Sequence, residues 1–203
     1  MFKSIREFFE RQQNYNRLSV YAIAGLSFLG NNIYFYKNGS LKTLFIIRHA
    51  KAETAFTIND FERPLNERGR KNAPEMAKRL LDQEIKIDAF VSSPATRAKE
   101  TAGYFAATYH YPAKNILLIS ALYHAPSEVF FEVIGELDNS IEHAAVFAHN
   151  PGITHFVNQL VPAVQINNMP TCGVYALRVD TESWQNFSKA KKEFLFFDYP
   201  KNG

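Results

Sequence analysis

Two arginines and two histidines stand at, or just after, the ends of three apolar runs in the sequence. They are Arg48, His49, Arg97 and His149. A guanidinium group binds phosphate through a planar set of donors, and a neutral imidazole can attack phosphorus. These residue types therefore indicate phosphoryl chemistry, provided that the fold brings the three runs together.

The apolar runs that precede these residues are short and continuous, as in strands buried on both faces of a parallel sheet. They are 44–47, 87–91 and 144–148. The carboxyl ends of such strands share one edge of an open α/β sheet, and ligands bind at that edge. We therefore expect the two arginines and the two histidines to surround a single phosphate-sized pocket.

Segments between and after these runs complete a three-layer α/β fold, with a mostly parallel central sheet flanked by helices. The expected helices cover 67–81, 94–109, 126–137 and 153–160, and the further strands cover 115–119, 172–179 and 193–197. Asn66 is expected to cap the first of these helices, and the alternative is that the regular helix begins at Pro74, which interrupts the pattern.

Two of the apolar runs lead directly into predicted helix starts. Ser93 and Pro94 have the types preferred at the N-cap and first helical position, and Asn150 and Pro151 repeat the pattern. Arg97 would then lie in a first helical turn, close to amide groups that favour anions.

Composition narrows the class of protein. The chain has 203 residues, 46% of them hydrophobic, and a formal net charge of +3 from 23 basic and 20 acidic side chains. The basic residues are scattered, so no nucleic-acid partner is expected. The single Cys172 excludes an internal disulfide and a cysteine-based metal site, and it fits a reducing, cytoplasmic compartment.

Residues 1–40 differ from the rest and are expected to form an N-terminal appendage to a domain over 41–203. The apolar run 18–30 is too short to span a bilayer, which takes about 20 residues. A signal peptide, contact with a membrane surface and a true translation start at Leu41 are alternative hypotheses for this segment.

The ordered set of motifs resembles the histidine phosphatase superfamily, which has the phosphoglycerate-mutase-like fold, and more narrowly the SixA-type phosphohistidine phosphatases. The matching pieces are Thr43–Ala52 with Arg48-His49-Ala50, Arg63–Gly69, Ser92–Arg97, Leu122–Tyr123, His149–Gly152 and Pro170–Thr171. Ala50 departs from the pattern, because much of the superfamily has glycine there.

The resemblance implies that His49 is a nucleophile that becomes covalently phosphorylated. Arg48, Arg97 and His149 would complete the phosphate pocket, and no metal or other cofactor is implied. Arg63 is a further candidate for substrate binding, with an ion pair that holds its own loop as the alternative.

A proton donor for the leaving group is missing from its expected place. Many superfamily phosphatases have a carboxylate after the third strand, but 120–126 contains none, and His124 is only a hypothetical substitute. Such a donor typically contributes about 10²–10⁴-fold to the rate. A phosphoramidate needs less help than an alkyl ester, because the departing nitrogen can already be protonated.

The sequence thus predicts a phosphatase that hydrolyses phosphohistidine on a protein partner. A phosphatase for small phosphomonoesters would use the same pocket and differ only in the leaving group. A mutase is disfavoured, because we see no inserted segments that would shield the pocket. A phosphate-binding module without catalysis would require an inert His49.

Overall fold

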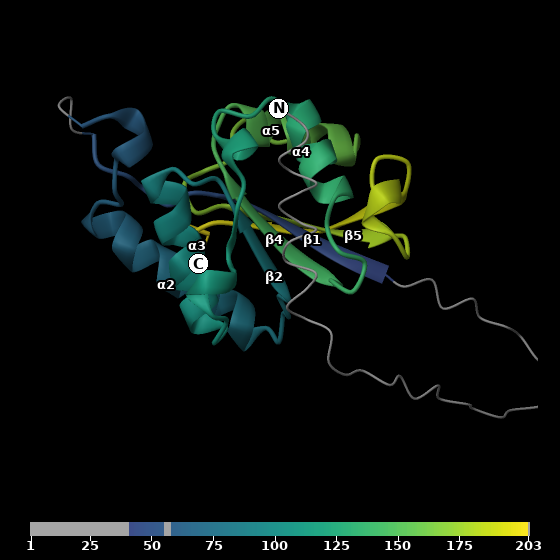
Figure 1. The fold of residues 1–203 in the computed structure, drawn as a ribbon, viewed down its shortest axis with the longest axis horizontal. Helices are drawn as coiled ribbons and strands as arrows, with labels where there is room; N and C mark the ends of the chain where they lie inside the picture. Colours follow the sequence, from purple (N-terminus) through teal and green to yellow (C-terminus); the bar gives the residue numbers. More distant parts are fainter. Residues whose placement is uncertain (1–40, 55–57, 203) are drawn as a thin grey trace, which may run out of the picture.

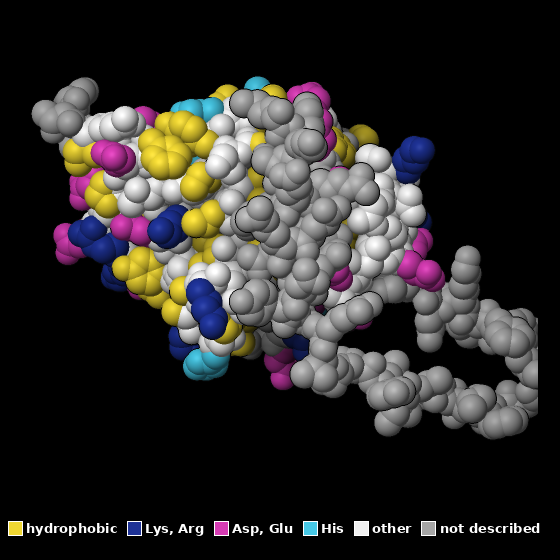
Figure 2. Space-filling view, in the orientation of Figure 1, with side chains coloured by type: hydrophobic (Ala, Val, Ile, Leu, Met, Phe, Trp, Pro, Cys, Tyr) yellow, Lys and Arg dark blue, Asp and Glu magenta, His cyan; other side chains and the backbone are white. Residues whose placement is uncertain are grey.

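The computed structural model describes residues 41–54 and 58–202. The expectations for residues 1–40, including the apolar run 18–30, lie outside the described residues. Among the described residues, no helix is long and apolar enough to cross a membrane. Figure 2 shows basic and acidic side chains interspersed over the visible face of this part of the chain.

One six-stranded mixed sheet forms the middle layer, with the strand order β3-β2-β4-β1-β5-β6. Its strands are β1 (Leu41–Arg48), β2 (Ala89–Ser92), β3 (Leu117–Leu118), β4 (His143–Ala148), β5 (Val174–Asp180) and β6 (Lys191–Asp198). The first four strands pair in parallel, whereas β5 and β6 pair antiparallel. The expected α/β class, with a helix-flanked central sheet, is confirmed.

Two pairs of helices cover the two faces of the sheet (Figure 1). One layer holds α2 (Glu67–Asp82) and α3 (Thr96–Thr108), and the other holds α4 (Ser127–Gly135) and α5 (Gly152–Leu160). Single-turn 3-10 helices lie in the connections: η1 (Asp60–Glu62), η2 (Ala113–Asn115), η3 (Ser120–Leu122) and η4 (Trp184–Asn186).

Strand β1 lies inside the sheet and is buried on both faces. Leu44 and Ile46 belong to the hydrophobic core under α4 and α5, while Phe45 and Ile47 belong to the core under α2 and α3. All four side chains are at most 2% exposed. The continuous apolar run therefore serves two cores at once, which is why it shows no polar alternation.

Several boundaries differ from the expected ones. Pro74 lies inside α2 and does not begin it, whereas Asn66 caps this helix as expected, with a side chain that accepts from the Gly69 amide. The N-cap of α3 is Ala95, not Ser93. Pro151 is the N-cap of α5, and the Asn150–Pro151 peptide bond is cis.

The register of the central strands brings the predicted site residues to one edge. Arg48 is paired with Ala148 between β1 and β4, and Ser92 is paired with Phe147 between β2 and β4. His49 and His149 therefore follow the ends of two adjacent parallel strands, β1 and β4, at the same level of the sheet. Strand β2, on the other side of β4, leads to the start of α3.

Candidate active site

His49 is held in one tautomer by its immediate surroundings. Its Nδ1 lies 2.7 Å from the carbonyl oxygen of Ala50, and the Nε of Arg97 lies 3.3 Å from its Nε2. A carbonyl only accepts and a guanidinium only donates, so the ring proton belongs on Nδ1. The lone pair of Nε2 then faces Arg97, which is the form that a nucleophilic imidazole requires.

Neighbouring segments fix the backbone around His49. The amide of Ala50 donates to the hydroxyl of Thr101 at 3.0 Å, and this hydroxyl donates to the carbonyl of Arg97 at 2.6 Å. On the other side, the amide of Cys172 contacts the carbonyls of Arg48 and His49, both at 3.1 Å. Helix α3 therefore positions His49 and Arg97 together.

His149 faces His49 across the edge of the sheet, with ring centroids 5.0 Å apart. Its Nε2 lies 2.8 Å from the Ser93 hydroxyl, which also accepts from the Ala95 amide at 3.3 Å. Ser93 is buried, and among the described residues its hydroxyl hydrogen has no acceptor other than Nε2, so we let the hydroxyl donate to Nε2 and assign the ring proton to Nδ1 on that basis.

Two buried donors at this edge have no partner within the described residues: Arg48 Nε and His149 Nδ1. Buried polar groups are nearly always hydrogen-bonded, so each unpaired one needs a reason. The other side of the Arg48 guanidinium is fixed, because its Nη1 donates to the Met169 carbonyl at 2.7 Å. Both unpaired atoms are of the kind that binds a phosphoryl oxygen.

The electrostatics of the edge keep both imidazoles neutral. Burial, reinforced by Arg97 and Arg48, lowers the pKa of His49 to about 3. Burial also lowers the pKa of His149 to about 2, with His49 and Arg97 adding to the effect. Burial and the neighbouring Arg97 lower the pKa of Arg48 as well. The site thus concentrates positive potential on two guanidinium groups while its histidines remain uncharged.

A carboxylate that the sequence analysis did not select, Asp60, bridges the arginines. Its Oδ2 accepts from Arg97 Nη2 at 2.9 Å, and its Oδ1 accepts from Arg63 Nη2 at 2.6 Å and Nε at 3.0 Å. Arg97 Nη1 also donates to the Asp60 carbonyl. Arg97 thus spans His49 and Asp60.

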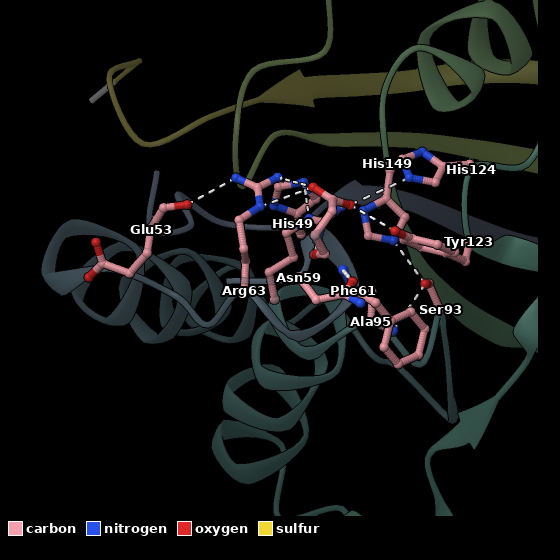
Figure 3. A network of polar contacts seen from close by, with 12 residues as sticks. His49, Glu53, Asn59, Phe61, Arg63, Ser93, Ala95, Tyr123, His124 and His149 are labelled. Atoms are coloured by element: carbon pink, nitrogen blue, oxygen red, sulfur yellow. Dashed lines mark hydrogen bonds and ion pairs between the residues drawn. The ribbon is translucent and has the colours of Figure 1, made fainter. Parts of the chain in front are cut away.

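Aromatic side chains lie beside Asp60 (Figure 3). The Tyr123 hydroxyl donates to Asp60 Oδ2 at 2.8 Å, and His124 Nε2 lies 3.4 Å from the same oxygen. Tyr123 also makes edge contacts with the rings of His149 and Phe61, at centroid distances of 5.7 and 5.1 Å. We call Asp60, Phe61, Tyr123 and His124 the rim of the site.

The rim is exposed, whereas the residues beneath it are buried. The side chains of Asp60 and His124 are 44% and 56% exposed, against 3% for the side chain of Arg97. Partial burial works against ionisation of Asp60, but hydrogen bonds from Tyr123, Arg63 and Arg97 prevail and hold its pKa below the usual range. The rim therefore presents a carboxylate among aromatic rings to the solvent.

Of the five predicted site residues, the structure brings Arg48, His49, Arg97 and His149 to one edge. Arg63 lies close enough for its charge to help lower the pKa of His49, but its hydrogen bonds go to Asp60 and to the Glu53 carbonyl, the latter at 2.9 Å, which is the loop-holding alternative.

Sequence reasoning missed Asp60 because it lies in a connection with no regular period. Its spacing of three residues from Arg63 was the only signal. The local pattern predicts Ser93 as a helix cap, and its hydroxyl does accept from the Ala95 amide, but the N-cap of α3 is Ala95 and the same hydroxyl also contacts His149. Among the described residues, no group of three or more His, Cys, Asp or Glu side chains is arranged to hold a metal ion.

Comparison with known proteins agrees with this geometry. Residues 44–116 match the histidine phosphatase superfamily (branch 1), a range that begins within β1, includes α3 and ends before β4. In sequence, no curated protein matches the chain.

Among solved structures, a protein from Agrobacterium tumefaciens assigned as the phosphohistidine phosphatase SixA is 24% identical, with a TM-score of 0.65 over 78% of this chain and 98% of its own. The protein histidine phosphatase SixA in complex with tungstate is 22% identical, with a TM-score of 0.68 over 79% and 98%. A SixA assignment from Nakamurella multipartitia is 20% identical, with a TM-score of 0.65 over 79% and 96%.

The fold is that of the histidine phosphatases, with the phosphoglycerate-mutase-like arrangement of sheet and helices. The predicted resemblance to this superfamily is confirmed over residues 44–116, and the fold is similar to that of the proteins assigned as SixA. The match to the superfamily supports a phosphatase.

Proposed function

We propose that the protein is a phosphohistidine phosphatase that works through a phosphorylated His49. The observation that supports this proposal is the position of the unprotonated Nε2 of His49, which lies 3.3 Å from the Nε of Arg97 and beside the His149 ring. A buried neutral imidazole with its lone pair directed at a guanidinium lies where a phosphoryl group would be both attacked and bound.

In the first step, the Nε2 lone pair of His49 forms a bond to phosphorus while the bond from phosphorus to the substrate nitrogen breaks. The departing nitrogen keeps the electron pair of that bond. Arg97, the Arg48 Nε–H and the His149 Nδ1–H donate to the phosphoryl oxygens, where negative charge is spread in the transition state. The charges of the two guanidinium groups stabilise the transition state without any proton transfer.

In the second step, water attacks the phosphorus of phosphorylated His49. The bond between phosphorus and Nε2 breaks and its electrons return to the imidazole, while one proton of the water passes to a phosphoryl oxygen, so that both protons leave with the phosphate as dihydrogen phosphate. The ring is neutral again because its own proton stayed on Nδ1, bound to the Ala50 carbonyl throughout.

The leaving group distinguishes phosphohistidine from an alkyl ester. An alkoxide needs a proton donor, and 120–126 supplies no carboxylic acid. Asp60 does lie next to Tyr123, but its pKa is held below the usual range, so it is a carboxylate and not a donor. This arrangement favours a leaving group that already carries its proton, as the imidazole of phosphohistidine can.

A paired assay tests the proposal. We expect the wild-type chain to have a higher kcat/KM for a phosphohistidine peptide than for p-nitrophenyl phosphate, and His49→Ala to lose both activities. A strong preference for the ester would indicate a phosphomonoesterase for small molecules. Loss of neither activity in His49→Ala would overturn the mechanism, and a wild-type chain inactive on both would indicate a phosphate-binding module.

The partner that we propose is a phosphohistidine-bearing protein, met in the cytoplasm. The exposed rim supports a protein substrate, because Asp60, Phe61 and His124 are all accessible at the entrance. The single, buried Cys172 is in keeping with a reducing compartment. Fractionation of the native cell, with detection of the full chain, tests the location.

A further inference from the structure

The rim combines features that the phosphate chemistry does not use. Phosphoryl binding calls for cations, yet Asp60 places a negative charge against Arg97, at 2.9 Å. A carboxylate there competes with a phosphoryl dianion for the same guanidinium, which is a cost unless the carboxylate has a task of its own.

The surroundings of Asp60 show how it can remain in place when phosphate binds. Arg63 holds Oδ1 through two donors, and Arg63 itself is anchored on the Glu53 carbonyl. Of the two carboxylate oxygens only Oδ2 contacts Arg97, which also donates from Nη1 to the Asp60 carbonyl. A phosphoryl group that drew the Arg97 guanidinium away would remove these donors from Asp60, while the two hydrogen bonds from Arg63 would still hold its carboxylate.

Oδ2 also faces rings. Tyr123 and His124 both approach this oxygen, and their own rings are 4.1 Å apart between centroids. Phe61, 37% exposed, stands edge-on to Tyr123. An ionised oxygen beside the polar edges of Tyr123 and His124 suits a flat ring with a positively charged N–H, through a charge-assisted hydrogen bond and contacts with the neighbouring aromatic side chains.

We propose that Asp60 is a specificity-determining residue, whose carboxylate accepts a hydrogen bond from the ring nitrogen of phosphohistidine that does not carry the phosphoryl group. This inference rests on the proposed function and names the leaving-group contact within it. Tyr123 and Phe61 would hold the plane of the same ring.

The contact has a direct chemical consequence. While the distal nitrogen keeps its proton, breaking the bond from phosphorus to nitrogen releases a neutral imidazole; without that proton the leaving group is an imidazolate anion. The electron pair goes to the nitrogen that bore phosphorus, and the distal proton stays on the ring. An ionised carboxylate favours the protonated ring, so here a base assists departure where an alkyl ester would need an acid.

The test compares Asp60→Asn with the wild type on two substrates, a phosphohistidine peptide and p-nitrophenyl phosphate. The amide keeps the shape of the side chain but loses its charge. We expect kcat/KM for the peptide to fall roughly 10- to 100-fold, the effect of losing a charged hydrogen bond. The ratio of the two kcat/KM values should shift by at least tenfold toward the ester, whose leaving group needs no proton.

A pH profile supplies a readout that a purely structural role would not move. In the wild type, peptide hydrolysis should persist to a higher pH than in Asp60→Asn, because the carboxylate keeps the ring protonated. Asp82→Asn is the matched control, since Asp82 is an exposed aspartate paired only with Lys78 on α2. It should reproduce both the wild-type ratio and the wild-type profile.

The outcomes separate this inference from the proposed function. Suppose that the wild type hydrolyses the peptide, and that Asp60→Asn lowers kcat/KM for both substrates by the same factor with an unshifted pH profile. The inference is then overturned and the proposed function stands. If the wild type hydrolyses only the ester, the function fails and the inference with it. Thermal unfolding of Asp60→Asn shows whether this variant is folded. A second variant, Asp60→Ala, must show the same shift in the ratio of the two kcat/KM values.

Discussion

Replacing Gly152 by alanine tests how closely the two halves of the site must approach. Gly152 begins α5, three residues after His149, and a Cβ built on it would lie 1.8 Å from the carbonyl oxygen of Ala125. Ala125 follows Tyr123 and His124, so the substitution presses the rim away from His149. The atom in the way is backbone, which cannot rotate aside.

The geometry sets the size of the effect. Ordinary van der Waals contact begins at 3.4 Å, so about 1.6 Å must open between α5 and the loop that carries the rim. Overpacking of this kind typically costs about 1–3 kcal/mol of folding free energy. A misplacement of about 1 Å at a catalytic site can lower the rate about 10²-fold.

Thermal unfolding and kcat/KM for p-nitrophenyl phosphate, measured on the same preparations, check both numbers. We expect a Tm lower by roughly 2–12 °C, from a cost of about 1–3 kcal/mol at about 2–4 °C per kcal/mol for a chain of this size. Gly103→Ala is the control, because a Cβ there meets nothing within 4 Å and lies inside α3. It should raise stability by about 0.5–1 kcal/mol.

A Gly152→Ala protein as stable and as active as the wild type would refute the reasoning. It would mean that the contact between α5 and the Ala125 carbonyl does not set the distance from His149 to the rim. Loss of stability without loss of activity would retain the packing argument and reject the catalytic one.

Three further outcomes are expected. Arg97→Lys should lower kcat/KM about 10²–10³-fold and abolish the protection that inorganic phosphate gives against heating, because a lysine lacks the planar fork. Ser93→Ala should lower kcat/KM about tenfold and destabilise the fold by about 1–3 kcal/mol, since it leaves His149 Nε2 buried without its donor. Acid should destabilise the protein, because histidines in the unfolded chain have a pKa near 6.5, whereas the pKa values of folded His49 and His149 are about 3 and about 2. The stability that these two residues contribute is therefore complete above pH 6.5 and falls as the pH is lowered toward 3. Thermal scans at pH 7, 5 and 4 measure this, and a His49→Gln chain should show a smaller fall.

The sequence was sufficient for the central strands and for the edge at which the site lies. Leu44–Ile47 is apolar throughout because both of its faces are covered, and this pattern leaves little room for another structure. Residues that follow such strands must meet, so Arg48, His49 and His149 could be placed together. The role of Asn66 as a helix cap could also be predicted, because its side chain accepts a hydrogen bond from the amide of Gly69.

The rim could not be derived in the same way. Asp60 acts through partners 3, 37 and 63 residues away, Arg63, Arg97 and Tyr123, and the pattern of its own loop specifies none of these contacts. Ser93 illustrates a related difficulty, because a serine before a proline suggests a cap by local rules while the tertiary fold gives its hydroxyl to His149. The periodicity of hydrophobic residues indicates which positions are buried, but it contains no information on polar contacts between distant loops.

The bond between His49 Nδ1 and the Ala50 carbonyl has a consequence for how the proposed intermediate would be recognised. A nitrogen whose hydrogen is committed to a carbonyl has no lone pair to offer phosphorus, so only one of the two regioisomers of phosphohistidine can form on the enzyme. Rapid quenching of the protein during turnover should trap the Nε2-linked isomer alone, and an isomer-selective antibody or ³¹P spectrum would distinguish it from the Nδ1-linked form.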